Sequence, residues 1–435
     1  MKRELGSLER ALVTLDRYAP FHSVYVLRIE APPPSQYLGR ALKFLQKRHS
    51  FLRTCLLREN GRIFFSELVE PVVPFRVLPR WNNEHWVKVV EVELDAHIES
   101  NTSPMFRCTY LYSENQRYAE IILTFFHSIV DTPSVGFLMD ELLTACASFM
   151  DGEPTAVLGL APAPPLESRF PSAYHGIRLS VRALGYNLRQ VMDETVYRIQ
   201  TREKRTPPLH TKPSHGHILS LTLPESFVAS LLHRADLEKI TLNALLNAAL
   251  MIAVNRHLYA GKDTPMRTVS LWDMRPYVEP PLRNADLGSY ISPLRHTVPV
   301  NGGMNVWHLA RSLQQRFFRS LKSGEHFAAA SVVDSLLRMA VRMRSFRLGA
   351  TVLNFYGKLP IKPKYGEFIV HDLHGYVSAH RLGPEFFGQV HFFQGQLTWD
   401  FSYLDADMTP DEAKAIVEEI KSILTSAVTS PLFTI

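Results

Sequence analysis

The chain has 435 residues, of which 46% are hydrophobic and 21% are charged. This balance is typical of a folded globular protein and excludes a disordered or fibrous one. The length exceeds that of one ordinary hydrophobic core, so we expect two domains. The three cysteines, Cys55, Cys108 and Cys146, form no CxxC pair, which excludes a disulfide framework and a cysteine zinc site. We expect buried, inert thiols.

The N-terminal segment carries no apolar stretch of signal-peptide length. Elsewhere the sequence has no window approaching about 18 uninterrupted apolar residues, the length that crosses a bilayer. We therefore expect a cytoplasmic protein without a transmembrane segment, acting as a monomer.

The net charge of +6 is concentrated in one segment. Residues 169–205 contain eight basic and three acidic residues. A local excess argues against general nucleic-acid binding, because the interleaved aromatic residues of single-strand binders are not apparent there. Three interpretations stay open: a solvated helix between lobes, a docking face for an acidic carrier protein or CoA phosphates, and contact with an anionic membrane surface.

The first half alternates strands and helices. Residues 23–31 read as a strand, a helix begins at Ser35, residues 52–57 restart a strand, and about 84–100 read as a second helix. A strand, a polar turn and another strand follow over 106–128. The segment 132–150 is an amphipathic helix for which Thr132 is a candidate N-cap, with Pro133 in the first turn.

Two proline-rich stretches around a basic helical segment mark the boundary between domains. The second half then repeats the order of strand, helix, strands and helix, and ends in β-rich sequence and a helix capped by Thr409. We predict an N-terminal lobe over residues 1–165, a basic helical linker or crossover over 166–213, and a C-terminal lobe over 214–435.

The stretch TFFHSIVDTP (124–133) has the composition of an active-site turn. An apolar strand runs into His127, and a helix begins about five residues later. A histidine at such a point can act as a general base, because its ordinary pKa lies near neutrality. Asp131 can orient the imidazole, fix the local backbone or pair with a cation. By itself this spacing is a weak signal, and it favours a buried histidine that ends a strand.

An ordered set of further motifs resembles the CoA-dependent acyltransferase superfamily, which includes chloramphenicol acetyltransferase, condensation domains and alcohol O-acyltransferases. The resemblance covers most of the chain, and its His-x-x-x-Asp motif falls on His127 and Asp131. The other similar stretches are ALKFLQKRHSFLRTCL (41–56), TLNALLNAALMIAVNRHL (241–258), LWDMRPYVEPPLRNADLGSYISPLRHTVPV (271–300), ATVLNFYGKLP (350–360) and QGQLTWDFSYLDADMTPDEAKAIVEEIKSIL (394–424).

The resemblance implies an α+β fold of two chloramphenicol-acetyltransferase-like lobes, each a mixed β-sheet flanked by helices, with an active-site tunnel at their interface. It further implies that His127 is the general base and that Asp131 is structural and pairs with an arginine, for which Arg275 is the candidate. Asn354, Ser289 and Ser292 are candidates for the oxyanion or substrate-binding site.

The implied activity is acyl transfer from a CoA or carrier-protein thioester to a hydroxyl or amine of a polyketide, lipid or other secondary-metabolite acceptor. The thioester is a substrate, so no permanently bound cofactor is expected. An acyl or peptidyl carrier protein is a possible partner, peripheral membrane contact is possible, and nucleic acid is not expected. Two alternatives remain open: a condensation-like protein that binds a carrier or product without transferase activity, and an atypical cyclisation or condensation enzyme.

Two positions depart from the superfamily pattern and bear on access to the site. Phe126 stands where the motif has a first histidine, and Thr132 stands where it has a glycine. Glycine there permits a tight backbone and open access, so threonine is expected to narrow the channel. His371 and His374 are histidines of the kind that bind metal ions, but no third ligand is evident near them in the sequence. We therefore expect no metal site.

Overall fold

The computed structural model describes residues 2–114, 116–153, 157–201, 214–283, 285–343 and 346–430. The described chain forms two compact units, which we treat separately. Unit 1 comprises residues 1–171, 274–291 and 358–378, and unit 2 comprises residues 172–273, 292–357 and 379–435. Of the predicted linker, residues 202–213 lie outside the described residues.

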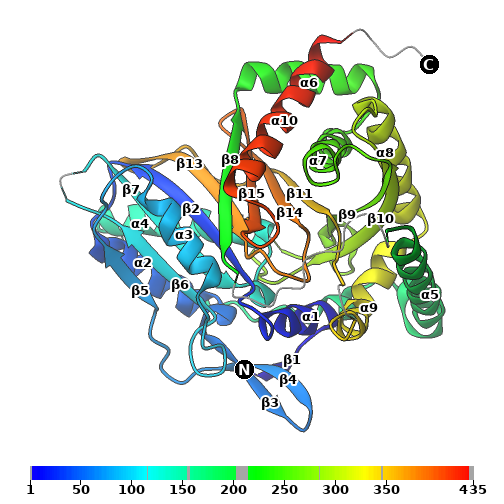
Figure 1. Cartoon of the computed structure of the whole chain (residues 1–435). Coiled ribbons are helices and arrows are strands. Elements are labelled where there is room, and N and C mark those ends of the chain that lie inside the picture. The colour runs from blue at the N-terminus through cyan, green and yellow to red at the C-terminus, as the bar shows by residue number, and fades with distance from the viewer. Residues whose placement is uncertain are drawn as a thin grey trace. The chain divides into compact units, whose positions relative to one another are not determined.

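The first sheet of unit 1 joins strands from both ends of the sequence. Its order is β12-β13-β2-β7-β6-β5, and its pairs are antiparallel except for the parallel β5–β6 pair. Strand β13, drawn orange, pairs along most of its length with β2, drawn blue (Figure 1). The strands are β2 (His22–Glu30), β5 (Phe75–Leu78), β6 (Phe106–Leu111), β7 (Tyr118–Phe126), β12 (Lys364–Tyr365) and β13 (Phe368–Val377).

A smaller antiparallel sheet of order β1-β4-β3 completes the β-structure of unit 1. Its strands are β1 (Lys2–Glu4), β3 (Thr54–Glu59) and β4 (Arg62–Glu67). Four helices accompany the two sheets: α1 (Ser7–Asp16), α2 (Ser35–Arg48), α3 (His85–Asp95) and α4 (Thr132–Met150). Helix α2 packs on α4, and α3 packs on the central strands β2 and β7.

Strands β2 and β7 are buried along almost their whole length. Their sequences, HSVYVLRIE and YAEIILTFF, are rich in β-branched and aromatic residues, which pack well on both faces of a covered sheet. The end of β7 therefore has a fixed place at the centre of the unit 1 sheet. The short 3₁₀ turn that carries the site, His127–Ile129, follows β7 directly.

The sheet of unit 2 has the order β10-β9-β11-β14-β15-β8. Strands β9 and β11 are parallel, whereas β15 pairs antiparallel with both β14 and β8. The strands are β8 (Gly216–Leu223), β9 (Thr264–Asp273), β10 (Ile291–Val300), β11 (Thr351–Lys358), β14 (Phe386–Phe393) and β15 (Gln396–Leu404). The helices are α5 (Gly176–Thr201), α6 (Glu225–Leu237), α7 (Leu242–Leu258), α8 (Val306–Lys322), α9 (Glu325–Ala340) and α10 (Pro410–Thr429).

Helix α7 forms the centre of the unit 2 core. Thirteen of its 17 residues are buried, as expected for a helix that is apolar on all sides. It packs against α8 and α10. The buried Asn247 is hydrogen-bonded to Asn243 and to the hydroxyl of Thr268 (3.0 Å), so the core polar group is satisfied.

The fold confirms the predicted α+β class with two mixed sheets flanked by helices. Two details differ from the sequence expectations. The helix expected over 84–100 ends at Asp95, where the backbone of the following Ala96 becomes extended. The boundaries of the compact units also differ. Residues 274–291 and 358–378 fall within the C-terminal lobe predicted from position 214 onward, but they belong to unit 1. The second of these segments contains β13, which pairs with β2.

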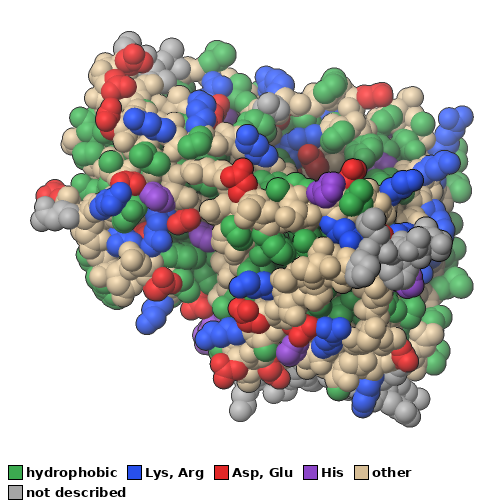
Figure 2. All heavy atoms as spheres, turned by 90° about the horizontal axis from the view of Figure 1, so that it is seen from above, with side chains coloured by type: hydrophobic (Ala, Val, Ile, Leu, Met, Phe, Trp, Pro, Cys, Tyr) green, Lys and Arg blue, Asp and Glu red, His purple; other side chains and the backbone are tan. Residues whose placement is uncertain are grey.

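The three cysteines are free and buried, as predicted. Burial raises the pKa of the Cys55 thiol and raises that of Cys146 to about 12, so neither supplies a thiolate near neutral pH. On the face shown in Figure 2, basic, acidic and hydrophobic side chains are interspersed. Within the described residues, no single helix has the length and apolar content of a membrane span; the sharply bent pair α6 and α7 meets that test only jointly.

Candidate active site

His127 is the first residue after β7 and is only 7% exposed. Its main-chain N–H donates to the carbonyl oxygen of Phe21, and the Phe21 ring stacks on the imidazole with centroids 5.5 Å apart. The imidazole Nδ1 lies 3.1 Å from the carbonyl oxygen of Val130. A carbonyl only accepts, so Nδ1 carries the proton and donates it there.

This hydrogen bond fixes the tautomer of the neutral imidazole. With the proton on Nδ1, the lone pair is on Nε2, and no side chain or main-chain group among the described residues is hydrogen-bonded to Nε2. Burial lowers the pKa of His127 from its ordinary 6.5, opposed by the Val130 hydrogen bond and by the charge of Asp131. The arrangement therefore presents a neutral nitrogen base near neutral pH.

Asp131 is only 1% exposed and is the N-cap of α4. One carboxylate oxygen accepts from the main-chain N–H of Ser134 (3.0 Å) and from Arg275 Nη2 (2.7 Å). The other accepts from Arg275 Nη1 (3.0 Å) and from the main-chain N–H of Tyr290 (2.9 Å). The carboxylate thus receives four hydrogen bonds, and His127 supplies none of them.

The Asp131–Arg275 pair is a bidentate ion pair within unit 1. Burial pushes the pKa of Asp131 upward, but the charge and hydrogen bonds of Arg275, with the N–H groups of Tyr290 and Ser134, outweigh it and hold the pKa below its ordinary 3.8. The pair ties the segment 274–291 to the start of α4. Arg275 Nη2 also donates to the Ser134 hydroxyl (2.8 Å), which donates to the carbonyl oxygen of Gly288 (3.0 Å).

Thr132 was expected to cap α4, and this expectation is wrong. Asp131 is the cap, and Thr132 is the first helical residue, because a carboxylate that also binds arginine satisfies the Ser134 N–H at the same time. The Thr132 hydroxyl lies 2.5 Å from the hydroxyl of Tyr25, a buried residue of β2. Burial raises the pKa of Tyr25, so this partner is neutral.

The remaining predicted site residues divide between the two units. Phe126 is 1% exposed and packs at a tilt on His22, and Ser289 is 3% exposed with no hydrogen-bond partner for its hydroxyl among the described residues. Both belong to unit 1, like His127. Ser292 and Asn354 belong to unit 2.

The two unit 2 candidates have their polar groups engaged. The Ser292 hydroxyl donates to the carbonyl oxygen of His326 (2.7 Å), so in this arrangement it has no proton to offer an oxyanion. The Asn354 amide donates to the Tyr356 hydroxyl, which donates to Gln389 (2.8 Å). Of the two serine candidates, Ser289 is therefore the one whose hydroxyl has no hydrogen-bond partner among the described residues.

The sequence analysis missed the groups that hold the site in place. The Val130 carbonyl that sets the His127 tautomer is a main-chain acceptor and has no signature in the sequence. Ser134, three positions after Asp131, could have been found as the usual N–H donor to an N-cap carboxylate. The Tyr290 N–H requires the fold to bring it beside Asp131.

Metal-ligand clusters are not found in the described part of the chain. Of the two histidines in HDLH, His371 lies 2.7 Å from Glu30, and His374 stacks on Trp86 with ring centroids 4.9 Å apart. Both imidazoles have structural partners.

Comparison with known proteins gives one family match and many similar folds. Residues 216–398 match the family model described as the phthiocerol/phthiodiolone dimycocerosyl transferase C-terminus. A comparison of this chain with curated proteins found no match.

Three solved structures illustrate the likeness in fold. The trichothecene 15-O-acetyltransferase of Fusarium sporotrichioides has a TM-score of 0.78 at 11% identity, covering 98% of this chain and 95% of its own. Polyketide synthase associated protein 5 of Mycobacterium tuberculosis has a TM-score of 0.71 at 13% identity, covering 98% of each chain. The first condensation domain of the calcium-dependent antibiotic synthetase has a TM-score of 0.72 at 13% identity, covering 100% of this chain and 98% of its own.

The chain therefore has the fold of the CoA-dependent acyltransferase superfamily, in which its residues 216–398 are similar to the C-terminal part of the dimycocerosyl transferases.

Proposed function

We propose that the protein is an acyltransferase in which His127 is the general base. The donor is an acyl thioester of CoA or of a carrier protein, and the acceptor is a hydroxyl or amine of a polyketide, lipid or other secondary metabolite. The observation that carries the proposal is the His127 tautomer: Nδ1 is committed to the Val130 carbonyl, which leaves the Nε2 lone pair available.

The proposed reaction needs one base that first takes a proton and then returns it. Nε2 of His127 accepts the acceptor's O–H or N–H proton as the acceptor atom attacks the thioester carbonyl carbon. The tetrahedral intermediate collapses as the C–S bond breaks, and the departing thiolate takes the proton from the His127 imidazolium. The new C–O or C–N bond remains, and the imidazole returns to its neutral form without a covalent acyl-enzyme.

The lowered pKa of His127 suits this role. A histidine that is neutral before substrate binds can accept a proton at neutral pH. Phe21, stacked on the ring, and the Val130 carbonyl restrict rotation of the imidazole, so little orientation is lost when the reaction begins.

Asp131 acts at a distance from the reacting atoms in this scheme. Its carboxylate is occupied by Arg275, Ser134 and Tyr290, so it positions the turn that carries His127 and does not accept the transferred proton. The Ser289 hydroxyl, buried and without a partner among the described residues, is the proposed donor to the oxyanion.

The proposed substrate classes come from the relatives. One solved neighbour is named for association with a polyketide synthase, one is an O-acetyltransferase, and one is a condensation domain of an antibiotic synthetase. The family matched by residues 216–398 is named for dimycocerosyl transfer. These names favour an oxygen acceptor and leave CoA and a carrier protein as alternative donors.

The proposal is tested with purified protein, a panel of short- and long-chain acyl-CoAs and acyl carrier proteins, and a panel of alcohols and amines. Release of free thiol and the mass of the acylated product are followed together. His127→Asn is the informative variant, because its amide can still donate to the Val130 carbonyl but offers no basic nitrogen. His233→Asn, at an exposed position on α6, is the matched control.

We expect product from the wild type and from His233→Asn, and none above background from His127→Asn. Equal rates in the wild type and His127→Asn would contradict the assignment of the base. A second candidate, a condensation-like binding protein, is favoured by Thr132, whose buried side chain occupies the position of the motif's glycine. Tight ligand binding without turnover of any donor, insensitive to His127→Asn, would support that candidate instead.

A further inference from the structure

Helix α5 has an unusual surface. Eight of the 21 exposed large hydrophobic side chains in the described part of the chain lie on this one helix of 26 residues. At a rise of about 1.5 Å per residue, the helix is about 39 Å long. A concentration of this kind on one element marks an interaction surface.

The inner face of α5 is firmly attached to unit 2. Tyr186 is buried in a small apolar cluster with Leu294, Ala328, Ala329 and Val332. About two turns further on, Glu194 accepts from Arg267 (2.8 Å), a residue of β9 that is only 1% exposed. The outer face is therefore presented on a fixed helix.

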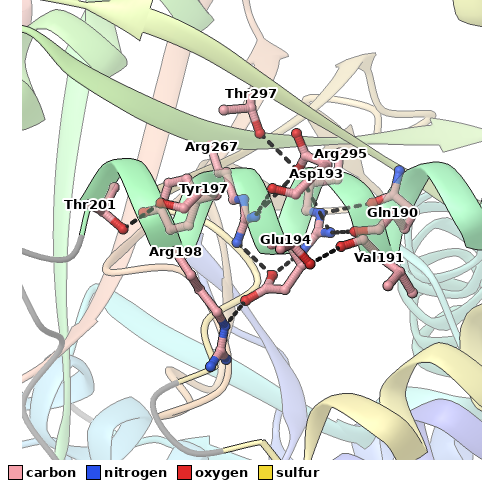
Figure 3. A network of polar contacts seen from close by, with 11 residues as sticks. Gln190, Val191, Asp193, Glu194, Tyr197, Arg198, Thr201, Arg267, Arg295 and Thr297 are labelled. Atoms are coloured by element: carbon pink, nitrogen blue, oxygen red, sulfur yellow. Dashed lines mark hydrogen bonds and ion pairs between the residues drawn. The ribbon is translucent and has the colours of Figure 1, made fainter.

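Polar contacts extend this attachment along about the last three turns of α5 (Figure 3). Asp193 is bonded to Arg267 (3.3 Å) and to the Thr297 hydroxyl (3.0 Å), and Arg295 donates to the Gln190 side chain (2.9 Å). The guanidinium of Arg267 also lies 3.6 Å from the centre of the Tyr197 ring. Both acidic residues of α5, Asp193 and Glu194, therefore accept hydrogen bonds from Arg267 on this inner side.

The outer face carries an aliphatic stripe, which only the exposed Thr195 interrupts. At about 100° per residue, six of its side chains fall within one sector of about 80°. They are Ile177 (84% exposed), Val181 (64%), Leu184 (60%), Leu188 (58%), Met192 (68%) and Ile199 (71%). We call these six residues the α5 stripe.

Basic residues border the α5 stripe. Arg178, Arg182 and Arg189 follow one edge, and Arg198 lies at the other. Arg178 is exposed and forms no ion pair or hydrogen bond with the residues that the structure describes. Arg182 donates to the carbonyl oxygen of Ser323, and Arg189 pairs with Glu325 but keeps a 58% exposed side chain. Arg198 pairs with Glu194 (2.6 Å), so the outer side of α5 is apolar along its centre and positive along the edge where Arg178 and Arg182 have no acidic partner among the described residues.

A second copy of the chain fits this surface poorly. Paired α5 helices would bury the stripes against each other, but each arginine edge would meet another arginine edge or neutral side chains, with no acidic residue on the outer side to complement it. A globular protein partner also fits poorly, because the stripe has no aromatic side chain to anchor a specific contact.

An anionic lipid bilayer matches both features. Aliphatic side chains form no hydrogen bonds, so they can insert among lipid acyl chains without a specific binding partner. Arginines at the edges of the stripe would then lie at the level of the lipid phosphates. We propose that α5 docks the protein peripherally on an anionic membrane, with the α5 stripe inserted between headgroups. This proposal rests on unit 2 alone and does not depend on the assignment of His127.

The test uses the full-length protein and flotation with two kinds of vesicle: phosphatidylcholine alone, and equimolar phosphatidylcholine and phosphatidylglycerol. Leu184→Gln/Leu188→Gln weakens the stripe. Leu232→Gln/Leu237→Gln on α6, where the leucines are 44% and 50% exposed, is the matched control. Circular dichroism and thermal denaturation establish that both variants are folded.

We expect the wild type to float with the anionic vesicles, to remain largely unbound with the neutral ones, and to be released by salt. The α5 double variant should lose about tenfold or more in partitioning, Arg178→Gln about fivefold, and the α6 control little. Three results would overturn the proposal: no binding of the wild type to anionic vesicles, equal binding by the α5 variant, or a wild-type dimer in solution that the α5 variant dissociates.

Discussion

The Asp131–Arg275 pair offers the sharpest test of the site's architecture. Asp131 is 1% exposed, and the side chain of Arg275 is 13% exposed. Removing one member of such a pair leaves the other buried without its counter-charge, which costs about 3–5 kcal/mol. For Asp131→Ala this includes about 1 kcal/mol for the lost cap of α4.

A double-mutant cycle separates the pair from its surroundings. Asp131→Ala, Arg275→Ala and the double variant are unfolded with urea, and hydrogen exchange at 131–135 reports on the start of α4. We expect the double variant to lose less unfolding free energy than the sum of the losses in the two single variants. The difference, which is the coupling energy, should be at least about 2 kcal/mol. Glu4→Ala, which breaks the largely exposed pair with Arg62, should change stability little.

The pH dependence provides a second readout of the same pair. Because the pKa of Asp131 is lowered in the folded protein, its stabilisation is present above the ordinary value and is lost as the pH falls through the folded one. The stability difference between wild type and Asp131→Ala should therefore shrink in acid. A coupling below about 0.5 kcal/mol, or a difference that does not change with pH, would refute the buried ion pair.

Three further predictions concern the surroundings of His127. Because burial lowers the pKa of His127 from 6.5, kcat/KM should stay constant as the pH falls to this value and decline only below it; a pH–rate profile that declines above it would contradict the neutral base. Thr132→Gly, which loses the hydroxyl contact with Tyr25, should destabilise by about 1 kcal/mol in urea unfolding, whereas Thr132→Ser should resemble wild type. Ser292→Ala should destabilise by about 0.5–1.5 kcal/mol by removing the buried hydrogen bond to the His326 carbonyl, whereas Ser289→Ala should leave unfolding nearly unchanged and lower kcat by about 10²-fold; the reverse order would contradict the roles assigned to the two serines.

Much of the fold was accessible from the sequence because its signals are local. Helix α10 begins after Thr409 with the capping box to Glu412, as the sequence predicts. The long apolar segment of α7 also reports directly on burial. The place of β13 in the sheet of unit 1 was not accessible, because pairing between residues about 350 positions apart leaves no pattern in either strand.

In the candidate site, too, some contacts could be predicted from the sequence and others could not. The Asp131–Arg275 ion pair was expected from the superfamily resemblance, and the structure contains it. The Val130 carbonyl and the Tyr290 N–H are main-chain groups, so their roles depend on backbone conformation and not on residue type. Asp131 is both the partner of Arg275, as expected, and the N-cap of α4, the role expected of Thr132.

The proposed role of His127 is tested most directly by kcat/KM for the best donor and acceptor pair, compared between wild type and His127→Asn. Loss of a general base whose position is otherwise preserved is expected to lower kcat/KM by about 10²–10⁴-fold, with the thermal stability of the variant close to that of wild type. A variant that retains the full wild-type kcat/KM would contradict the account.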